Sequence, residues 1–188
     1  VYGNAGCGVR SDSGANGLFR ANYVHEGRGR AGIAFEGSAV GRCEDNRVVG
    51  NAGCGIEITT AAKPHVVGNS VSGSPDGYGI HIHSGGEGVL EGNEIFENAL
   101  AGVCTETTGN PRMIKNKVHD GLGCGVSCMS GGLGLLEQNE IWGNAGPGVD
   151  ITTGACPSLR RNIIRNGKDS GVFIHDSGEG SLEENDVF

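Results

Sequence analysis

The chain has 188 residues, including 37 glycines and 5 prolines, and its formal net charge is −8. Glycine without a proline excess or a three-residue period excludes collagen and proline-rich disorder. The acidic balance and scattered basic residues exclude nucleic acid and an anionic membrane surface as partners, because both need clustered positive charge. No apolar run approaches the ~20 residues of a membrane span, so we expect no membrane partner.

Two sets of residues recur every 23 or 24 positions along the chain. The first set is a glycine before Val or Ile: Gly8, Gly32, Gly55, Gly79, Gly102, Gly125, Gly148 and Gly171. The second set is an asparagine: Asn22, Asn46, Asn69, Asn93, Asn116, Asn139, Asn162 and Asn185. Two independent ladders in one register indicate eight structural repeats.

Each repeat contains three short strands in a fixed order. The first follows the glycine and alternates, as in Ile80–His83. The second carries one apolar residue in constant phase: Phe19, Cys43, Val66, Leu90, Met113, Leu136, Leu159 and Leu182. The third follows the asparagine and carries another: Val24, Val48, Val71, Ile95, Val118, Ile141, Ile164 and Val187. Alternation and β-branched residues favour strands over helices.

Three strands in about 23 residues predict an all-β, right-handed parallel β-helix of eight rungs, in which equivalent residues stack ~4.8 Å apart. We expect residues 1–188 to form a single domain, excised from a longer chain. The asparagines should bond the backbone at one bend. The glycine columns should mark tight bends with positive φ. Odd and even rungs differ in their bends, as in "GNAGCG" (50–55) against "VSGSPDGYG" (71–79), which predicts a two-rung alternation.

The first strands expose two outward columns, and these hold the candidate chemistry. In mid-solenoid the columns place Glu57 beside His81, and His83 beside Glu106. Such pairs suit acid–base chemistry on a glycan or a metal site, although a solvated polar face explains them too. Because a uronate-processing enzyme needs a cation and only Arg10 lies on this face, we lean towards no catalysis. We expect no metal and no cofactor.

Two further groups are weaker candidates. Asp150, Thr152 and His175 form a second polar set on the same columns. On the third strands, Phe96, Trp142 and Phe188 recur at two-rung intervals and could stack on sugars or anchor a protein partner. Partial cover by neighbouring bends is the alternative for these aromatics. The seven cysteines match no metal-binding spacing, and we interpret them as small core or bend thiols.

Two segments resemble a known family, namely "GNPRMIKNKVHDGLGCGVSCMSGGLGLLEQNEIWGNAGPGVDI" (109–151) and "GVFIHDSGEGSLEENDVF" (171–188). They are similar to the β-helix repeats of F-box-only ubiquitin-ligase substrate receptors, also called carbohydrate-binding and sugar-hydrolase repeats. The matching phrases are Asn110–Asn116, Gly132–Asn139 and Gly178–Asn185. The resemblance implies a surface without catalysis that recognises a protein in a ubiquitin conjugation pathway. It implies no particular binding residues.

The sequence therefore predicts a protein-recognition scaffold first and a glycan-binding or polysaccharide-processing domain second. The odd cysteine count and the lack of an Asn-x-Ser/Thr site favour an intracellular location, cytoplasm or nucleus, over secretion. A solenoid without caps exposes strand edges at both ends, so end-to-end self-association is also expected.

Overall fold

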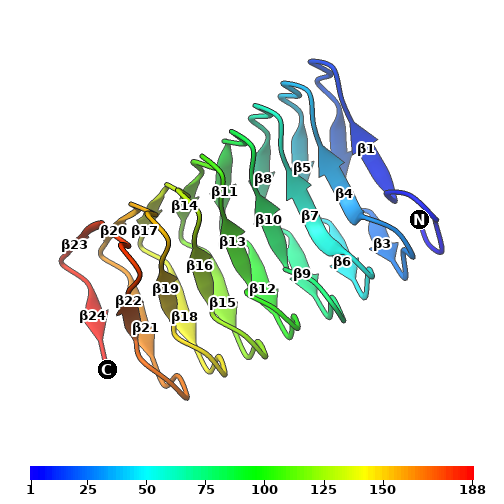
Figure 1. Ribbon diagram of the computed structural model, residues 1–188. Coiled ribbons are helices and arrows are strands. Elements are labelled where there is room, and N and C mark those ends of the chain that lie inside the picture. Colours follow the sequence, from blue (N-terminus) through cyan, green and yellow to red (C-terminus); the bar gives the residue numbers. More distant parts are fainter.

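The computed structural model describes residues 1–188 and contains 24 short strands and no helix. The strands form three eight-stranded parallel sheets, each contributing one strand to every rung. The rungs stack in a row, with the two chain ends at opposite ends of the row (Figure 1). This is the predicted parallel β-helix of eight rungs. No helix is long and apolar enough to cross a membrane.

The first sheet carries the candidate site and holds the first strand of each rung. Its strands, in spatial order, are β1 (Val9–Ser11), β4 (Ala31–Phe35), β7 (Cys54–Ile58), β10 (Ile80–Ile82), β13 (Val103–Thr105), β16 (Val126–Cys128), β19 (Val149–Ile151) and β22 (Val172–Ile174).

The second and third sheets close each rung. The second sheet comprises β2 (Leu18–Arg20), β5 (Arg42–Glu44), β8 (His65–Val67), β11 (Val89–Glu91), β14 (Arg112–Ile114), β17 (Leu135–Glu137), β20 (Ser158–Arg160) and β23 (Ser181–Glu183). The third sheet comprises β3 (Tyr23–His25), β6 (Arg47–Val49), β9 (Ser70–Ser72), β12 (Glu94–Phe96), β15 (Lys117–His119), β18 (Glu140–Trp142), β21 (Ile163–Arg165) and β24 (Asp186–Val187).

The core is a narrow column of small aliphatic side chains inside the three sheets. One cluster of 27 buried residues runs from Val24 to Ile164, and Phe35 is its only aromatic member. The predicted inward columns of the second and third strands lie in it, as Leu90 and Ile95 do in rung 4, except at the ends, where Phe19 is only partly buried and Leu182 and Val187 are exposed. With the core filled in this way, outward side chains and bends are the places left for chemistry.

The asparagine ladder forms as predicted at the bend between the second and third sheets. Asn93 shows the pattern: its backbone N–H and its Nδ2 both donate to Oδ1 of Asn116, at 3.0 and 2.9 Å. Its Nδ2 also donates to the carbonyl oxygen of Val66 at 2.9 Å. The Asn-to-Asn pair of bonds repeats in every rung from Asn22 to Asn185. Buried amides are thereby satisfied along the whole bend.

The prediction that the glycine ladder has positive φ is wrong, because none of its eight members has positive φ. One complete column of left-handed residues lies immediately before the ladder asparagines: Ala21, Asp45, Gly68, Gly92, Lys115, Gln138, Arg161 and Glu184, with φ between 53° and 65°. The ladder glycines are required by close packing. A Cβ on Gly125 would lie 2.5 Å from both the Gly148 oxygen and Cγ2 of Ile141.

A second asparagine set confirms the two-rung alternation. Asn51, Asn98 and Asn144 are buried in the bends that lead into odd rungs. Their Oδ1 atoms accept from the backbone N–H groups of the preceding bend, which belong to Gly27, Ser74 and Gly121. The asparagine side chains therefore join the two kinds of bend in pairs.

Candidate functional site

The candidate site lies on the outer face of the first sheet at rungs 3 to 5. Glu57 is in β7, His81 is in β10, and His83 and Glu106 directly follow β10 and β13. Glu57 and His81 are register partners in neighbouring strands. Because side chains alternate, Ile80 and Ile82 enter the core while the histidines point outward. The sequence places these four residues on one patch, and the structure does the same.

The bonds within the patch run diagonally rather than between register partners. His83 Nε2 lies 3.1 Å from Oε1 of Glu57, and His81 Nε2 lies 3.1 Å from Oε1 of Glu106. The sequence predicts that Glu57 pairs with His81 and that His83 pairs with Glu106. In the structure the two histidines exchange these partners. Each long side chain leans along the strand towards a neighbour two positions away, a reach that Cα register alone does not reveal.

A cation that the sequence analysis missed also belongs to the patch. Arg30 precedes β4. Its Nη1 lies 2.9 Å from a carboxylate oxygen of Glu36, and its Nη2 lies 2.9 Å from a carboxylate oxygen of Glu57. Its side chain remains 54% exposed. Arg10 contacts Glu36 from the other side at 2.9 Å. The interpretation that Arg10 is the only basic residue on this face is therefore wrong, because Arg30, from the bend before β4, also contacts the carboxylates of the face.

A phenol and a thiol border the histidines. The ring of Tyr78 lies 4.7 Å from that of His81, centroid to centroid, and the two histidine rings are 4.4 Å apart. Burial raises the pKa of Tyr78 to about 12, and the nearby Cys104 and Glu106 side chains add to the rise. Burial also raises the pKa of Cys104 to about 12. Both groups therefore stay protonated at neutral pH.

The charge states of the patch follow from opposed effects. Burial lowers the pKa of His81, and the charge of His83 lowers it further, while Glu106 raises it. Burial opposes ionisation of Glu57, but His83 and Arg30 outweigh that cost and hold the pKa of this carboxyl below its usual value. The patch thus presents a neutral imidazole next to an ionised carboxylate and a guanidinium at neutral pH.

The weaker polar set forms only in part. His175 Nε2 lies 3.2 Å from Oδ1 of Asp150, and its Nδ1 lies 2.9 Å from Oδ2 of Asp176. Thr152 bonds its neighbour Thr153 and does not contact the histidine. No Lys or Arg forms an ion pair with this group, which makes it a simpler His–carboxylate contact than the patch around His81.

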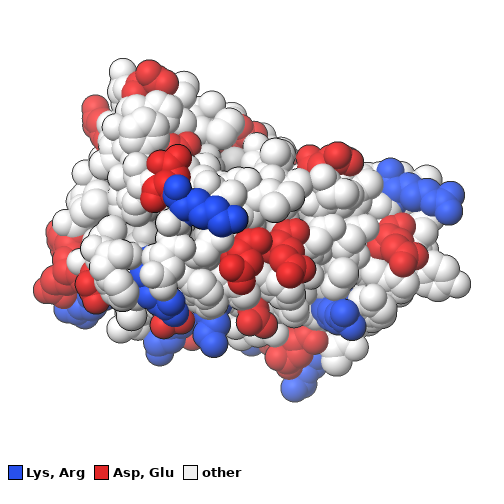
Figure 2. Space-filling model, turned by 90° about the horizontal axis from the view of Figure 1, so that it is seen from below, with Lys and Arg blue, Asp and Glu red and all other residues white.

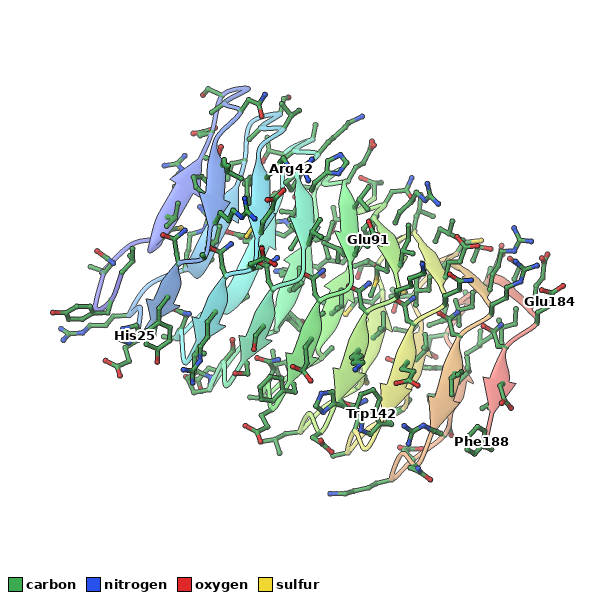
Figure 3. The ribbon with its side chains drawn as sticks, turned by 180° about the vertical axis from the view of Figure 1, so that it is seen from behind. His25, Arg42, Glu91, Trp142, Glu184 and Phe188 are labelled. Carbon is green, nitrogen blue, oxygen red and sulfur yellow. The ribbon has the colours of Figure 1, made fainter.

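The aromatic candidates are partly covered by one another. Phe96, His119 and Trp142 form a continuous stack, with centroid separations of 5.4 and 4.2 Å, and Arg165 lies over the other face of Trp142 at 5.2 Å. His25, Trp142 and Phe188 follow one row of the third sheet (Figure 3). Phe188 is 68% exposed and lies outside the stack. Both faces of Trp142 are therefore occupied within the chain.

The cysteines and surface charges add no second centre. All seven cysteines are free, and Cys43 and Cys128 point into the core as predicted. Cys156 is exposed and lies in the bend between β19 and β20, in agreement with the interpretation of the cysteines as core or bend thiols. On the face seen from below, Lys and Arg are interspersed with Asp and Glu rather than gathered in one patch (Figure 2).

Comparison with known proteins establishes the family. The profile described as "Right handed beta helix region" matches residues 1–71 and 65–188, and the chain belongs to that family. No curated protein matches the chain by sequence. The A-module of mannuronan C-5 epimerase AlgE4 from Azotobacter vinelandii superposes with a TM-score of 0.77 at 19% identity, over 92% of this chain and 54% of that one.

A second solved structure is similar. The periplasmic alginate epimerase AlgG, as its T265N mutant, has a TM-score of 0.60 at 12% identity, over 97% of this chain and 48% of that one. The chain thus spans about half the length of these proteins, and the likeness concerns the fold. The comparisons support the β-helix part of the predicted resemblance. None of them supports its F-box receptor part.

Proposed function

We propose that this β-helix processes uronate polysaccharides by abstracting the proton at C5 of a bound sugar, as an epimerase or lyase does. The observation that carries the proposal is the single patch that unites Arg30, Tyr78, His81 and His83 with two carboxylates. This proposal places polysaccharide processing before protein recognition, the reverse of the order that the sequence suggests. The reason is Arg30, the cation that such an enzyme needs.

Arg30 is the group that would receive the sugar carboxylate. A C5–H bond next to a carboxylate becomes acidic only when the negative charge of the carboxylate is neutralised. The guanidinium has five N–H donors in a planar fork, and about half of the Arg30 side chain is open to solvent. It can therefore bind a further carboxylate while it keeps its contacts with Glu36 and Glu57.

His81 is the candidate base. A base must be unprotonated at working pH, and burial lowers the pKa of His81 and so favours the neutral imidazole. Its Nε2–H donates to Oε1 of Glu106 at 3.1 Å, which leaves the lone pair of the neutral imidazole on Nδ1. Transfer of the C5 proton to Nδ1 leaves the electron pair on C5, delocalised into the carboxylate, and the bond to Glu106 stabilises the resulting imidazolium.

Tyr78 is the candidate acid. With a pKa of about 12 its hydroxyl remains protonated and can donate. Donation to C5 completes an epimerisation, and donation to the departing 4-oxygen completes an elimination. In both cases the imidazolium of His81 must then return one proton to the Tyr78 phenolate, through solvent, before the next turnover. The names of the two similar solved structures, both epimerases of alginate type, support the first outcome.

The test is proton exchange at C5. Polymannuronate and polygalacturonate are incubated with the protein in D₂O, and NMR follows deuterium entry, while ultraviolet absorbance follows an unsaturated product. Arg30→Gln, His81→Ala and Tyr78→Phe should each lower the rate at least ~100-fold. His175→Ala, which removes the simpler His–carboxylate contact, is the matched control and should keep the activity.

Full activity in Arg30→Gln and His81→Ala, or no exchange with any polyuronate, would overturn the proposal. In the latter case the protein-recognition reading, including its F-box version, becomes the leading one. A crosslinking screen with the intact chain would then test it. A specific, saturable protein partner would support that reading.

A further inference from the structure

Three side chains of the patch are arranged as metal ligands. One ligand atom from each of Glu57, His81 and His83 can be chosen so that all three atoms lie within 4.8 Å of one another. His81 lies in β10 and His83 directly follows it, with the buried Ile82 between them, so both rings leave the same face. Glu57 comes from the neighbouring strand β7. Two of the three donors therefore lie in paired strands, and the third lies at the end of one of them.

The chemistry of these donors selects a class of ion. Two imidazoles and one carboxylate suit zinc, cobalt and nickel, whereas calcium and magnesium prefer oxygen donors alone. Zinc binds imidazole nitrogen and carboxylate oxygen at about 2.0–2.2 Å. The His83 and Glu57 atoms are already 3.1 Å apart, and no two of the three ligand atoms are more than 4.8 Å apart.

Two hydroxyl groups lie beside the second ring nitrogen of His83. Its Nδ1 lies 3.0 Å from Oγ of Ser84 and 3.3 Å from Oγ1 of Thr59. In the metal-free chain the 3.1 Å hydrogen bond to Glu57 places a proton on Nε2. A metal ion would take the place of that proton, and the Nδ1–H of the metal-bound ring could then donate to these hydroxyls. Metal-binding histidines generally use their second nitrogen in this way.

We propose that Glu57, His81 and His83 form a binding site for a divalent transition-metal ion of the zinc type. Solvent supplies the remaining coordination position. Metal binding itself does not depend on the proposed function. One consequence does rest on it: an ion bound to His81 leaves the imidazole without a free lone pair, so zinc should inhibit the proposed uronate reaction.

Arg30 separates this inference from the proposed function. Its guanidinium lies 2.9 Å from Oε2 of Glu57 and competes with a metal ion for that carboxylate. Arg30→Gln should therefore tighten metal binding severalfold, since one positive charge leaves the site. The same substitution should abolish C5 proton exchange. Opposite changes from one variant identify two different roles for the patch.

The experiment is titration of the chelator-treated chain with Co²⁺ and Zn²⁺, by visible absorption and calorimetry. One ion should bind per chain, without sulfur-to-cobalt charge transfer. His81→Ala and His83→Ala should each weaken binding more than about tenfold, because loss of a ligand costs at least as much as loss of its outer partner. His175→Ala and Cys156→Ser are matched controls and should leave affinity unchanged.

Three results would overturn the site: no binding at micromolar to millimolar cobalt, thiolate charge transfer, or unchanged affinity in both histidine variants. Circular dichroism of each variant checks that the β-helix remains folded. These readouts need no substrate, so an inactive protein that binds cobalt would remove the proposed function and leave the metal site standing.

Discussion

Arg30 shows how a single side chain changes the interpretation of the patch. Arg30 precedes β4 and lies outside the outward columns of the first sheet, so the repeat spacing does not place it beside Glu57. The columns do place Glu57, His81, His83 and Glu106 together, since the two-residue alternation and the rung spacing are written in the sequence. Side-chain reach and diagonal pairing depend on rotamers, which the repeat does not encode.

The protonation of His81 gives a prediction at the same scale. Its pKa is lowered below 6.5, chiefly by burial, so the neutral base is available at and above that pH. In chelator-treated protein, kcat/KM for C5 exchange should rise as pH increases through a pKa below 6.5, and should be level at higher pH. Glu106 raises the pKa of His81, so Glu106→Gln should move this acidic limb to lower pH. A limb that stays in place, or one that lies above 6.5, would contradict the assignment of His81 as the base.

Among the elements, the strands and their bends follow from the sequence to different degrees. The strand positions are predictable because the inward columns are apolar and the ladder asparagines recur every 23 or 24 residues. The left-handed bend residue is not, because side chains as different as Lys115 and Gln138 occupy it. A non-glycine residue with positive φ costs roughly 1 kcal/mol or more, and the ladder bonds of the following asparagine offset that cost.

The ladder glycines give the prediction at this scale. A Cβ on Gly125 would meet the Gly148 oxygen and the Ile141 side chain at 2.5 Å, so Gly125→Ala should destabilise the chain by about 2–3 kcal/mol. Gly6 has open space and no positive φ, which makes Gly6→Ala the matched control with an expected change below about 0.5 kcal/mol. Denaturant unfolding measures both. Equal stabilities would show that the rungs can move apart to accept the methyl group.

In the stack formed by residues 1–188, the first and last rungs each pair with a neighbour on one side only. In the last rung, side chains that are fully buried elsewhere in the same columns become open: Leu182 is 44% and Val187 is 47% exposed. Parallel strands at such an edge also present unpaired backbone groups. The order of the stack was predictable from its repeats, whereas the depth of exposure at each end depends on three-dimensional packing.

We predict that the 188-residue chain self-associates through this end in a concentration-dependent way. Light scattering should show mass rising with concentration, because association buries the apolar column of the last rung. Val187→Lys should suppress the effect, while Lys168→Ala, an exposed bend substitution, should not. A monomer at every concentration tested would contradict the prediction.

The pairing of the two kinds of bend has a consequence for how such a chain can change its length. The side-chain oxygens of Asn51, Asn98 and Asn144 accept only from the bend before them, and those bends alternate along the stack. Loss of a bend that carries such an asparagine, or duplication of one that does not, would put two bends without it side by side and leave a backbone N–H without its acceptor. Growth by pairs of rungs keeps every partner. We therefore expect insertions and deletions in its evolutionary descendants to come in units of two rungs.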